Sequence, residues 1–114
     1  MPQDAVLQIT DQDASQPGNR ILILNGPLVL ATVFGFQAKV RADQSQTLVI
    51  DFSNVPYADS AGIGALVGAY VTRQHSKRSL ALVGVNNRVR DALKVTHVEQ
   101  FFEFFDSISA AERV

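Results

Sequence analysis

The sequence has 114 residues, of which 46% are hydrophobic and 18% charged, and its formal net charge is −1. These values are typical of one soluble globular domain, here predicted over residues 1–114. The small charge gives no general attraction to nucleic acid or to an anionic membrane. The absence of cysteine excludes disulfides, thiolate catalysis and cysteine-ligated zinc. No basic, apolar leader and no apolar stretch of ~20 residues is present, so we expect a cytoplasmic protein without direct membrane insertion.

The first half of the chain predicts two strands, a helix and a third strand. Alternating apolar residues indicate a strand over 5–10, and the turn-forming residues 11–19 indicate a long loop or hairpin turn. The apolar run 21–24 is short and ends at a Gly-Pro turn, which is typical of a strand covered on both faces. Apolar residues at helical spacing predict a helix over 30–42. The segment 47–52 is rich in residues that favour a strand.

The second half continues this alternation of strands and helices. Apolar residues from 63 to 70, spaced i, i+3, i+4 and i+7, predict an amphipathic helix that begins near Ala61. A buried strand over 79–85 and a short helix over 86–95 follow, and then come a short strand near 101–105 and a last helix. This order predicts an α/β domain with a largely parallel inner sheet. Because the first two strands can pair as an antiparallel hairpin, we expect a mixed sheet.

The segment NVPYADSAGIGALVGAY, residues 54–70, brings Asp59 and Ser60 to the point where a strand ends and a helix begins. Ligands of α/β sheets gather beyond the carboxyl ends of the strands. Ser60 suits the N-cap of this helix, and a helix N-terminus also accommodates a phosphate. Gly62 lacks a side chain and would let another molecule approach the serine closely. The local pattern alone favours a simple helix cap over a modification site, and leaves both open.

A nucleophilic role for Ser60 lacks a partner base. His75 lies roughly 20 Å along the same helix, and His97 follows the next helix. The sequence ADSAG does not match the nucleophile elbow G-x-S-x-G. The glycines are spaced G-x-G-x-x-x-G, unlike phosphate-binding loops, and Gly64 and Gly68 are predicted to allow close packing of helix on sheet. Since no metal ligands cluster either, we expect no enzyme, no metal and no cofactor.

Two segments, 47–70 and 80–111, resemble the STAS domain family, and most of all its stand-alone anti-sigma factor antagonists. The core D-S-x-G-[IL]-x-x-L, one strand after LVIDFS, carries the resemblance, which extends more weakly over 22–40. It implies a mixed sheet of four or five strands with about four helices mainly on one side. It also implies a regulatory, non-enzymatic protein.

The resemblance implies a phosphorylation switch. In this family an anti-sigma factor that is also a serine kinase phosphorylates the serine after the aspartate, which is Ser60 here. The unmodified antagonist binds the anti-sigma factor and frees the sigma factor, phosphorylation abolishes binding, and a phosphatase restores it. Asp51, at the strand end, would tune Ser60 or simply terminate the strand. The implied partner-binding surface consists of Tyr57, Asp59, Ser60, Ala61, Gly62 and Ile63.

The chain departs from the family pattern at three positions. Val29 replaces an acid that often follows the second strand, and this change bears directly on recognition by a kinase. Ala61 stands where Ser or Thr is common, and His97 where Gly is common. Two alternatives within the family therefore stay open: a scaffold subunit of a stress-sensing complex, and a soluble STAS subunit of a lipid transporter.

Two further clusters have competing interpretations. The aromatic segment 101–105 is either part of the core or a partner-binding patch, and its composition favours the core. Arg88, Arg90 and Lys94 form a basic cluster that either lies on a solvated helix face or meets an acidic partner.

Overall fold

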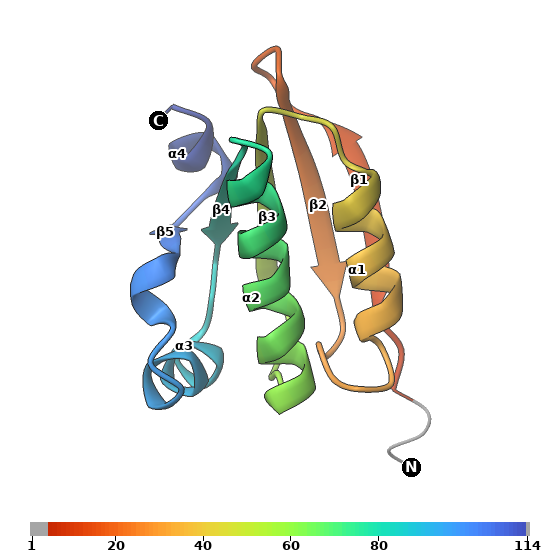
Figure 1. Cartoon of the computed structure of the whole chain (residues 1–114), viewed down its shortest axis with the longest axis vertical. Coiled ribbons are helices and arrows are strands. Elements are labelled where there is room, and N and C mark those ends of the chain that lie inside the picture. The colour runs from red at the N-terminus through yellow and green to blue at the C-terminus, as the bar shows by residue number, and fades with distance from the viewer. Residues whose placement is uncertain (1–4, 114) are drawn as a thin grey trace.

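Five strands pair in the order in which they occur in the chain, β1-β2-β3-β4-β5, in a computed structural model that describes residues 5–113 (Figure 1). Among the strands of residues 5–113, β1 and β2 are antiparallel and the other neighbouring pairs are parallel. The mixed five-stranded sheet confirms the predicted α/β fold, while the extent of the domain over residues 1–114 stays a prediction. The strands are β1 Gln8–Asp13, β2 Asn19–Asn25, β3 Thr47–Asn54, β4 Ser79–Val83 and β5 Glu103–Phe105.

The helices alternate with the parallel strands. They are α1 Val33–Ala42, α2 Ser60–His75, α3 Asn87–Val95, the short 3₁₀ helix η2 Glu99–Phe101, and α4 Ile108–Glu112. Each crossover advances to the next strand in the same direction, and crossovers are right-handed, so α1, α2 and α3 share one face of the sheet. Figure 1 shows α1 and α2 side by side on that face. Because α1 follows β2 and α2 follows β3, both helices begin beyond the carboxyl ends of parallel strands. The short α4 packs on the opposite face.

Two predicted elements differ from the structure by three residues, and local hydrogen bonds explain one of these differences. Smaller differences occur where the strand predicted over 79–85 ends at Val83 and the strand predicted near 101–105 begins at Glu103. The first strand occupies residues 8–13 where 5–10 was predicted, which shortens the expected loop. The helix α1 begins at Val33, three residues later than predicted. The preceding residues form a turn in which the Thr32 amide donates to Val29 O (2.8 Å) and the Thr32 hydroxyl donates to Pro27 O (2.9 Å). These bonds compete with helix formation in that segment.

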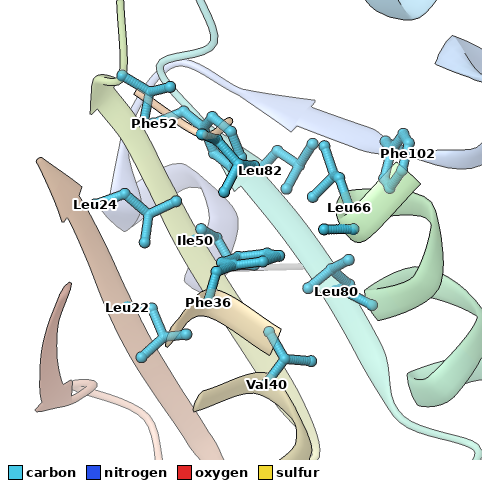
Figure 2. Close-up of a cluster of buried hydrophobic side chains, with 14 of the residues drawn as sticks. Leu22, Leu24, Phe36, Val40, Ile50, Phe52, Leu66, Leu80, Leu82 and Phe102 are labelled. Atoms are coloured by element: carbon cyan, nitrogen blue, oxygen red, sulfur yellow. The ribbon is translucent and has the colours of Figure 1, made fainter. Parts of the chain in front are cut away.

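Alternation along the strands divides the core between two faces. The larger part lies under the helices and contains the side chains that Figure 2 labels: Leu22, Leu24, Phe36, Val40, Ile50, Phe52, Leu66, Leu80, Leu82 and Phe102. On the other face, Ile21, Val49, Ala81 and Val83 pack against Ala111 of α4. The prediction that the strand containing residues 21–24 is covered on both faces is therefore confirmed. The segment 101–105 is divided between core and surface, since Phe102 is buried and Phe101 is 42% exposed.

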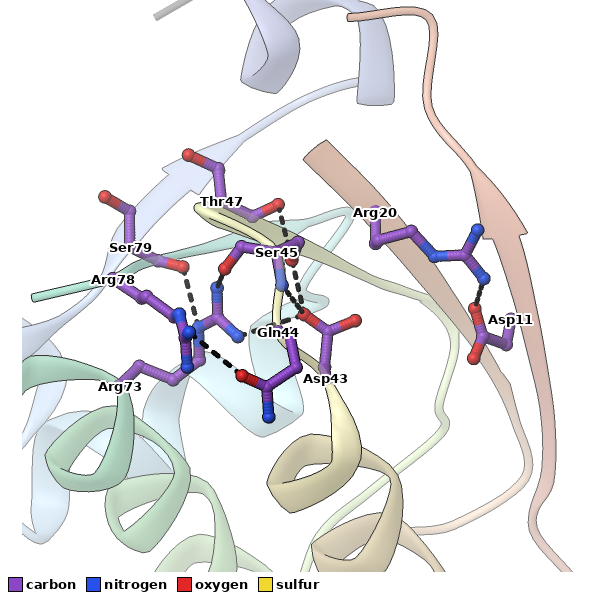
Figure 3. A network of polar contacts seen from close by, with 9 residues as sticks. All are labelled: Asp11, Arg20, Asp43, Gln44, Ser45, Thr47, Arg73, Arg78 and Ser79. Carbon is purple, nitrogen blue, oxygen red and sulfur yellow. Dashed lines mark hydrogen bonds and ion pairs between the residues drawn. The ribbon is translucent and has the colours of Figure 1, made fainter. Parts of the chain in front are cut away.

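A buried arginine closes the end of the sheet away from Ser60. Arg73 of α2 is 2% exposed and donates to Ser79 O (2.9 Å), Ser45 O (2.7 Å) and the Asp43 carboxylate (3.1 Å) (Figure 3). Burial lowers the pKa of the Arg73 guanidinium, and its pairing with Asp43 opposes that shift. This network joins the end of α2 to the starts of β3 and β4. Each acceptor of Arg73 lies outside α2, so the sequence pattern of that helix alone does not predict the network.

Candidate functional site

The loops that follow β2 and β3 meet at the carboxyl edge of the sheet. Leu28 extends the parallel pairing beyond the strands: its amide donates to Tyr57 O (3.1 Å), and its carbonyl accepts from the Asp59 amide (3.3 Å). Leu28 is also paired with Ala58 in an isolated parallel bridge. Because Leu28 is fully buried, this contact anchors the loop 55–59. The anchored loop delivers Asp59 and Ser60 to the surface at the start of α2.

Asp59, not Ser60, is the N-cap of α2. The Asp59 backbone is extended, and its Oδ1 accepts from the Gly62 amide (2.8 Å). Its Oδ2 accepts from the Leu30 amide (3.1 Å), so one carboxylate holds both the helix start and the loop that follows β2. The predicted cap at Ser60 is wrong. Asp and Ser cap about equally well, and the additional bond to Leu30 favours Asp59.

Ser60 is the first residue of α2, and its side chain is free. The residue is exposed, and its hydroxyl makes no hydrogen bond within residues 5–113. A helix start presents backbone N–H groups and a partial positive charge, which suit an added phosphate. Ser60 is therefore an accessible hydroxyl at a helix start, where the field of the helix favours negative charge.

The remaining predicted surface residues divide into two groups. Tyr57 and Asp59 are exposed and Ala61 is half-buried, whereas Gly62 and Ile63 are buried. A Cβ atom on Gly62 would lie 1.9 Å from Leu28 O. This glycine therefore serves the close approach of α2 to the loop after β2, and the expectation that it opens space for another molecule is wrong. Gly62 and Ile63 are buried beneath the exposed residues of the site, so a partner cannot contact them directly.

Gly64 and Gly68 also differ from expectation. Both are exposed on the outer side of α2, and a Cβ atom on either would have no heavy atom within 4 Å. The prediction that they allow close packing of the helix on the sheet is therefore wrong.

Arg88 lies at the rim of this site. The Asn86 side chain caps α3 by accepting from the Val89 amide (2.8 Å), and it donates to the carbonyls of residues 55 and 56, in the loop before Asp59. This attachment holds Arg88 with its guanidinium carbon 4.9 Å from the centre of the Tyr57 ring. Arg90 instead lies over the ring of Phe104 and pairs with Glu99. The predicted basic cluster is thus divided, since Arg88 contacts Tyr57 and Arg90 contacts Phe104.

Asp51 does not face Ser60. Its carboxylate accepts from the amide (2.9 Å) and the hydroxyl (2.6 Å) of Ser53. Alternation along β3 puts Asp51 on the same face as Val49, opposite the side chains that contact α2. The arrangement supports the strand-terminating interpretation of Asp51.

Ser60 makes no hydrogen bond to either histidine within residues 5–113. His75 is the last residue of α2, roughly 22 Å from Ser60 by helix rise, and His97 follows α3 in a left-handed conformation. Across residues 5–113 no three His, Cys, Asp or Glu side chains group as a metal site would require. In the same part of the chain, no helix has the length and apolar character needed to cross a bilayer.

The STAS domain family model matches residues 12–111, and the chain belongs to this family. The Anti-sigma-B factor antagonist of Staphylococcus aureus is 28% identical over 57 residues, which cover 50% of this chain and 53% of that protein. The chain thus matches about half the length of these curated relatives.

Solved structures share the fold across nearly the whole chain. An anti-sigma factor antagonist from Mycobacterium paratuberculosis superposes with a TM-score of 0.77 at 18% identity, covering 99% of this chain and 95% of that one. The unphosphorylated anti-sigma factor antagonist SpoIIAA gives 0.73 at 17% identity and 95% coverage of both chains. A murine anion transporter, Solute Carrier 26 family member A9, gives 0.73 at 23% identity, covering 96% of this chain and 21% of the transporter. At these identities the likeness establishes the fold alone.

Proposed function

We propose that this protein is an anti-sigma factor antagonist whose binding to an anti-sigma factor with serine kinase activity is turned off by phosphorylation of Ser60. The observation that supports this most is the exposed, unbonded hydroxyl of Ser60 directly after the capping Asp59. The names of the relatives and of the similar structures agree with this role. The protein would act in the cytoplasm and regulate transcription that depends on a sigma factor.

In the unmodified state the partner would cover the exposed group of Tyr57, Asp59 and Ser60, with Ala61 at its inner edge. Backbone hydrogen bonds that link Leu28 to Tyr57 and Asp59, and the close packing of Gly62 on Leu28, fix the positions of these exposed residues. A rigid surface loses little conformational freedom when it binds, which favours affinity.

Phosphorylation would act on the surface and leave the fold in place. A phosphoserine adds about −1.5 to −2 charges. The carboxylate of Asp59 is fixed by its bonds to Gly62 and Leu30 and cannot turn away from this charge. Covering two adjacent anionic groups with a partner costs several kcal/mol, which weakens binding by orders of magnitude. The helix N-terminus stabilises the same phosphate, so unfolding would not accompany release.

Tandem mass spectrometry on the protein purified from its own cells, in growth and under stress, tests the modification. A phosphate on Ser60 whose occupancy changes with condition supports the proposal. The anti-sigma factor kinase is then captured from the same cells, and its binding is compared for Ser60→Asp, Ser60→Ala and the parent. The aspartate variant should bind at least about tenfold more weakly, and the alanine variant should bind but resist modification. Ser109→Asp, at an exposed position on α4, is the matched control, and equal weakening by that variant would contradict the proposal.

A second candidate function is that of a soluble STAS subunit of a lipid transporter, or of a scaffold in a stress-sensing complex. The half-buried Val29, in place of an acid, favours a role without the usual kinase. Ser60 that is unmodified in every condition would support the transporter role. Phosphorylated Ser60 within a large assembly would support the scaffold.

A further inference from the structure

The outer side of α2 is apolar although solvent covers it. From Ser60 to Thr72 the helix contains no charged residue, and the next one, Arg73, is buried. Gly64, Gly68 and Val71 face outward, and Val71 is 46% exposed. A helix that is apolar on all sides is normally covered on all sides. The outer side of α2 therefore has the composition of a contact surface.

Large apolar side chains continue this surface onto α1. Leu30 is 64% exposed and Phe34 is 73% exposed. Phe34 and Arg41 are two helical turns apart on one side of α1, and Arg41 borders a hollow of about 100 Å³ between α1 and α2 that Gly68 also lines. We call Leu30, Phe34, Arg41, Gly64, Gly68 and Val71 the α1–α2 face.

The two glycines of this face have no structural role inside the described chain. Glycine within a helix is destabilising relative to alanine, and a Cβ atom at Gly64 or Gly68 would have no atom of the other described segments within 4 Å. Gly62, two residues earlier, is required by the contact with Leu28. The absence of side chains at 64 and 68, one turn apart, leaves the α2 backbone open to the close approach of another helix.

A negative charge and a positive charge lie at opposite ends of the α1–α2 face. Asp59 is fixed beside Leu30 at the start of the helices, by the 3.1 Å bond from the Leu30 amide. Arg41 lies near the end of α1, and neither α1 nor α2 contains an acidic residue. Because α1 and α2 both follow parallel strands, they run in the same direction (Figure 1). An antiparallel second copy would bring each Arg41 to the Asp59 end of the other chain.

We propose that the α1–α2 face binds a second copy of this chain and forms a two-fold symmetric dimer with antiparallel helices. In this dimer the two α2 helices would cross at Gly64 and Gly68. Arg41 of each copy would lie against Phe34 and Asp59 of the other. A two-fold axis makes one face its own partner, and such dimers are the commonest protein oligomers. The inference does not depend on the proposed function.

Analytical ultracentrifugation of the purified full chain, up to about 200 µM, tests the proposal. The parent should form dimers in a concentration-dependent manner. Gly68→Gln should raise the dissociation constant at least about tenfold, and Arg41→Glu should raise it and reduce its dependence on salt. Gly35→Gln is the matched control, because Gly35 is an exposed helix glycine directed toward Ile9 and away from α2. It should dimerise as the parent does.

Two results would overturn the proposal. One is a parent that stays monomeric at every concentration tested. This result would overturn the proposal even if a different protein were found to cover the face. The other is a dimer that Gly64→Gln and Gly68→Gln leave intact. At a concentration at which the parent is monomeric, the melting temperatures of both variants should not fall below that of the parent, because a Cβ atom at either position has no neighbouring atom within 4 Å among the other described segments. Loss of the dimer will then not reflect unfolding. The Ser60 binding comparison is separate, so either hypothesis can fail alone.

Discussion

The substitution Gly62→Ala tests how closely α2 approaches the loop that follows β2. A Cβ atom there would lie 1.9 Å from the carbonyl oxygen of Leu28 and 2.8 Å from its carbonyl carbon. Both are backbone atoms that cannot rotate away, so α2 or the loop must shift. The shift would break the hydrogen bonds from Asp59 N to Leu28 O (3.3 Å) and from Leu30 N to the Asp59 carboxylate (3.1 Å).

The expected loss of stability follows from three contributions. Overpacking costs about 1–3 kcal/mol, and the two lost hydrogen bonds contribute about 1 kcal/mol each. The better helix propensity of alanine offsets about 0.5–1 kcal/mol. The free energy of unfolding should therefore fall by about 2–4 kcal/mol, out of the roughly 5–15 kcal/mol typical of a whole domain. The melting temperature should fall by about 10–15 °C.

Thermal and urea unfolding, followed by far-ultraviolet circular dichroism, measure this loss. Gly64→Ala is the matched control in the same helix, where the added Cβ would meet no atom within 4 Å. The control should gain about 0.5–1 kcal/mol. A Gly62→Ala variant that unfolds at or above the melting temperature of the parent would refute the close approach of α2 to Leu28, and with it this account of how the site is positioned.

Three further predictions concern the site and its support. Asp59→Ala should lower the free energy of unfolding by about 1–2 kcal/mol in urea titrations, because α2 loses its cap and the Leu30 amide loses its acceptor; an unchanged urea midpoint would contradict the capping role. Arg73→Met should cost about 3–5 kcal/mol, since it leaves the Asp43 carboxylate buried without its partner, and Arg73→Met combined with Asp43→Leu should recover part of that loss. Val29→Asp should speed phosphorylation of Ser60 by the captured kinase in a timed assay, and an unchanged rate would show that Val29 does not limit recognition.

The order and type of the elements could be predicted from the sequence, because they depend on local patterns. Alternating or continuous apolar runs define β2, β3 and β4, and helical spacing defines α2. The family resemblance identified Asp59-Ser60 as the candidate site, and the STAS domain match confirms the family. The local signals were weaker where turns compete with regular structure, as at Thr32 before α1.

Contacts between distant segments decided the details of the site. Asp59 caps α2 in preference to Ser60 because it also binds the Leu30 amide, 29 residues earlier in the chain. A glycine is required at position 62 because a Cβ atom there would lie 1.9 Å from Leu28 O, whereas a Cβ atom at Gly64 or Gly68 would have no neighbouring atom within 4 Å among the other described segments.

The arginines near the site also have partners in other segments, whereas alternation along its own strand places Asp51. Asp51 turns to the opposite face of the sheet, where it binds Ser53. Arg88 and Arg90, two residues apart in one helix, find different aromatic partners. By itself, the sequence determined which main elements form and that the second helix starts close to Ser60, because backbone periodicity is local. Only the tertiary structure decided which groups surround that serine, because their partners come from other strands and helices.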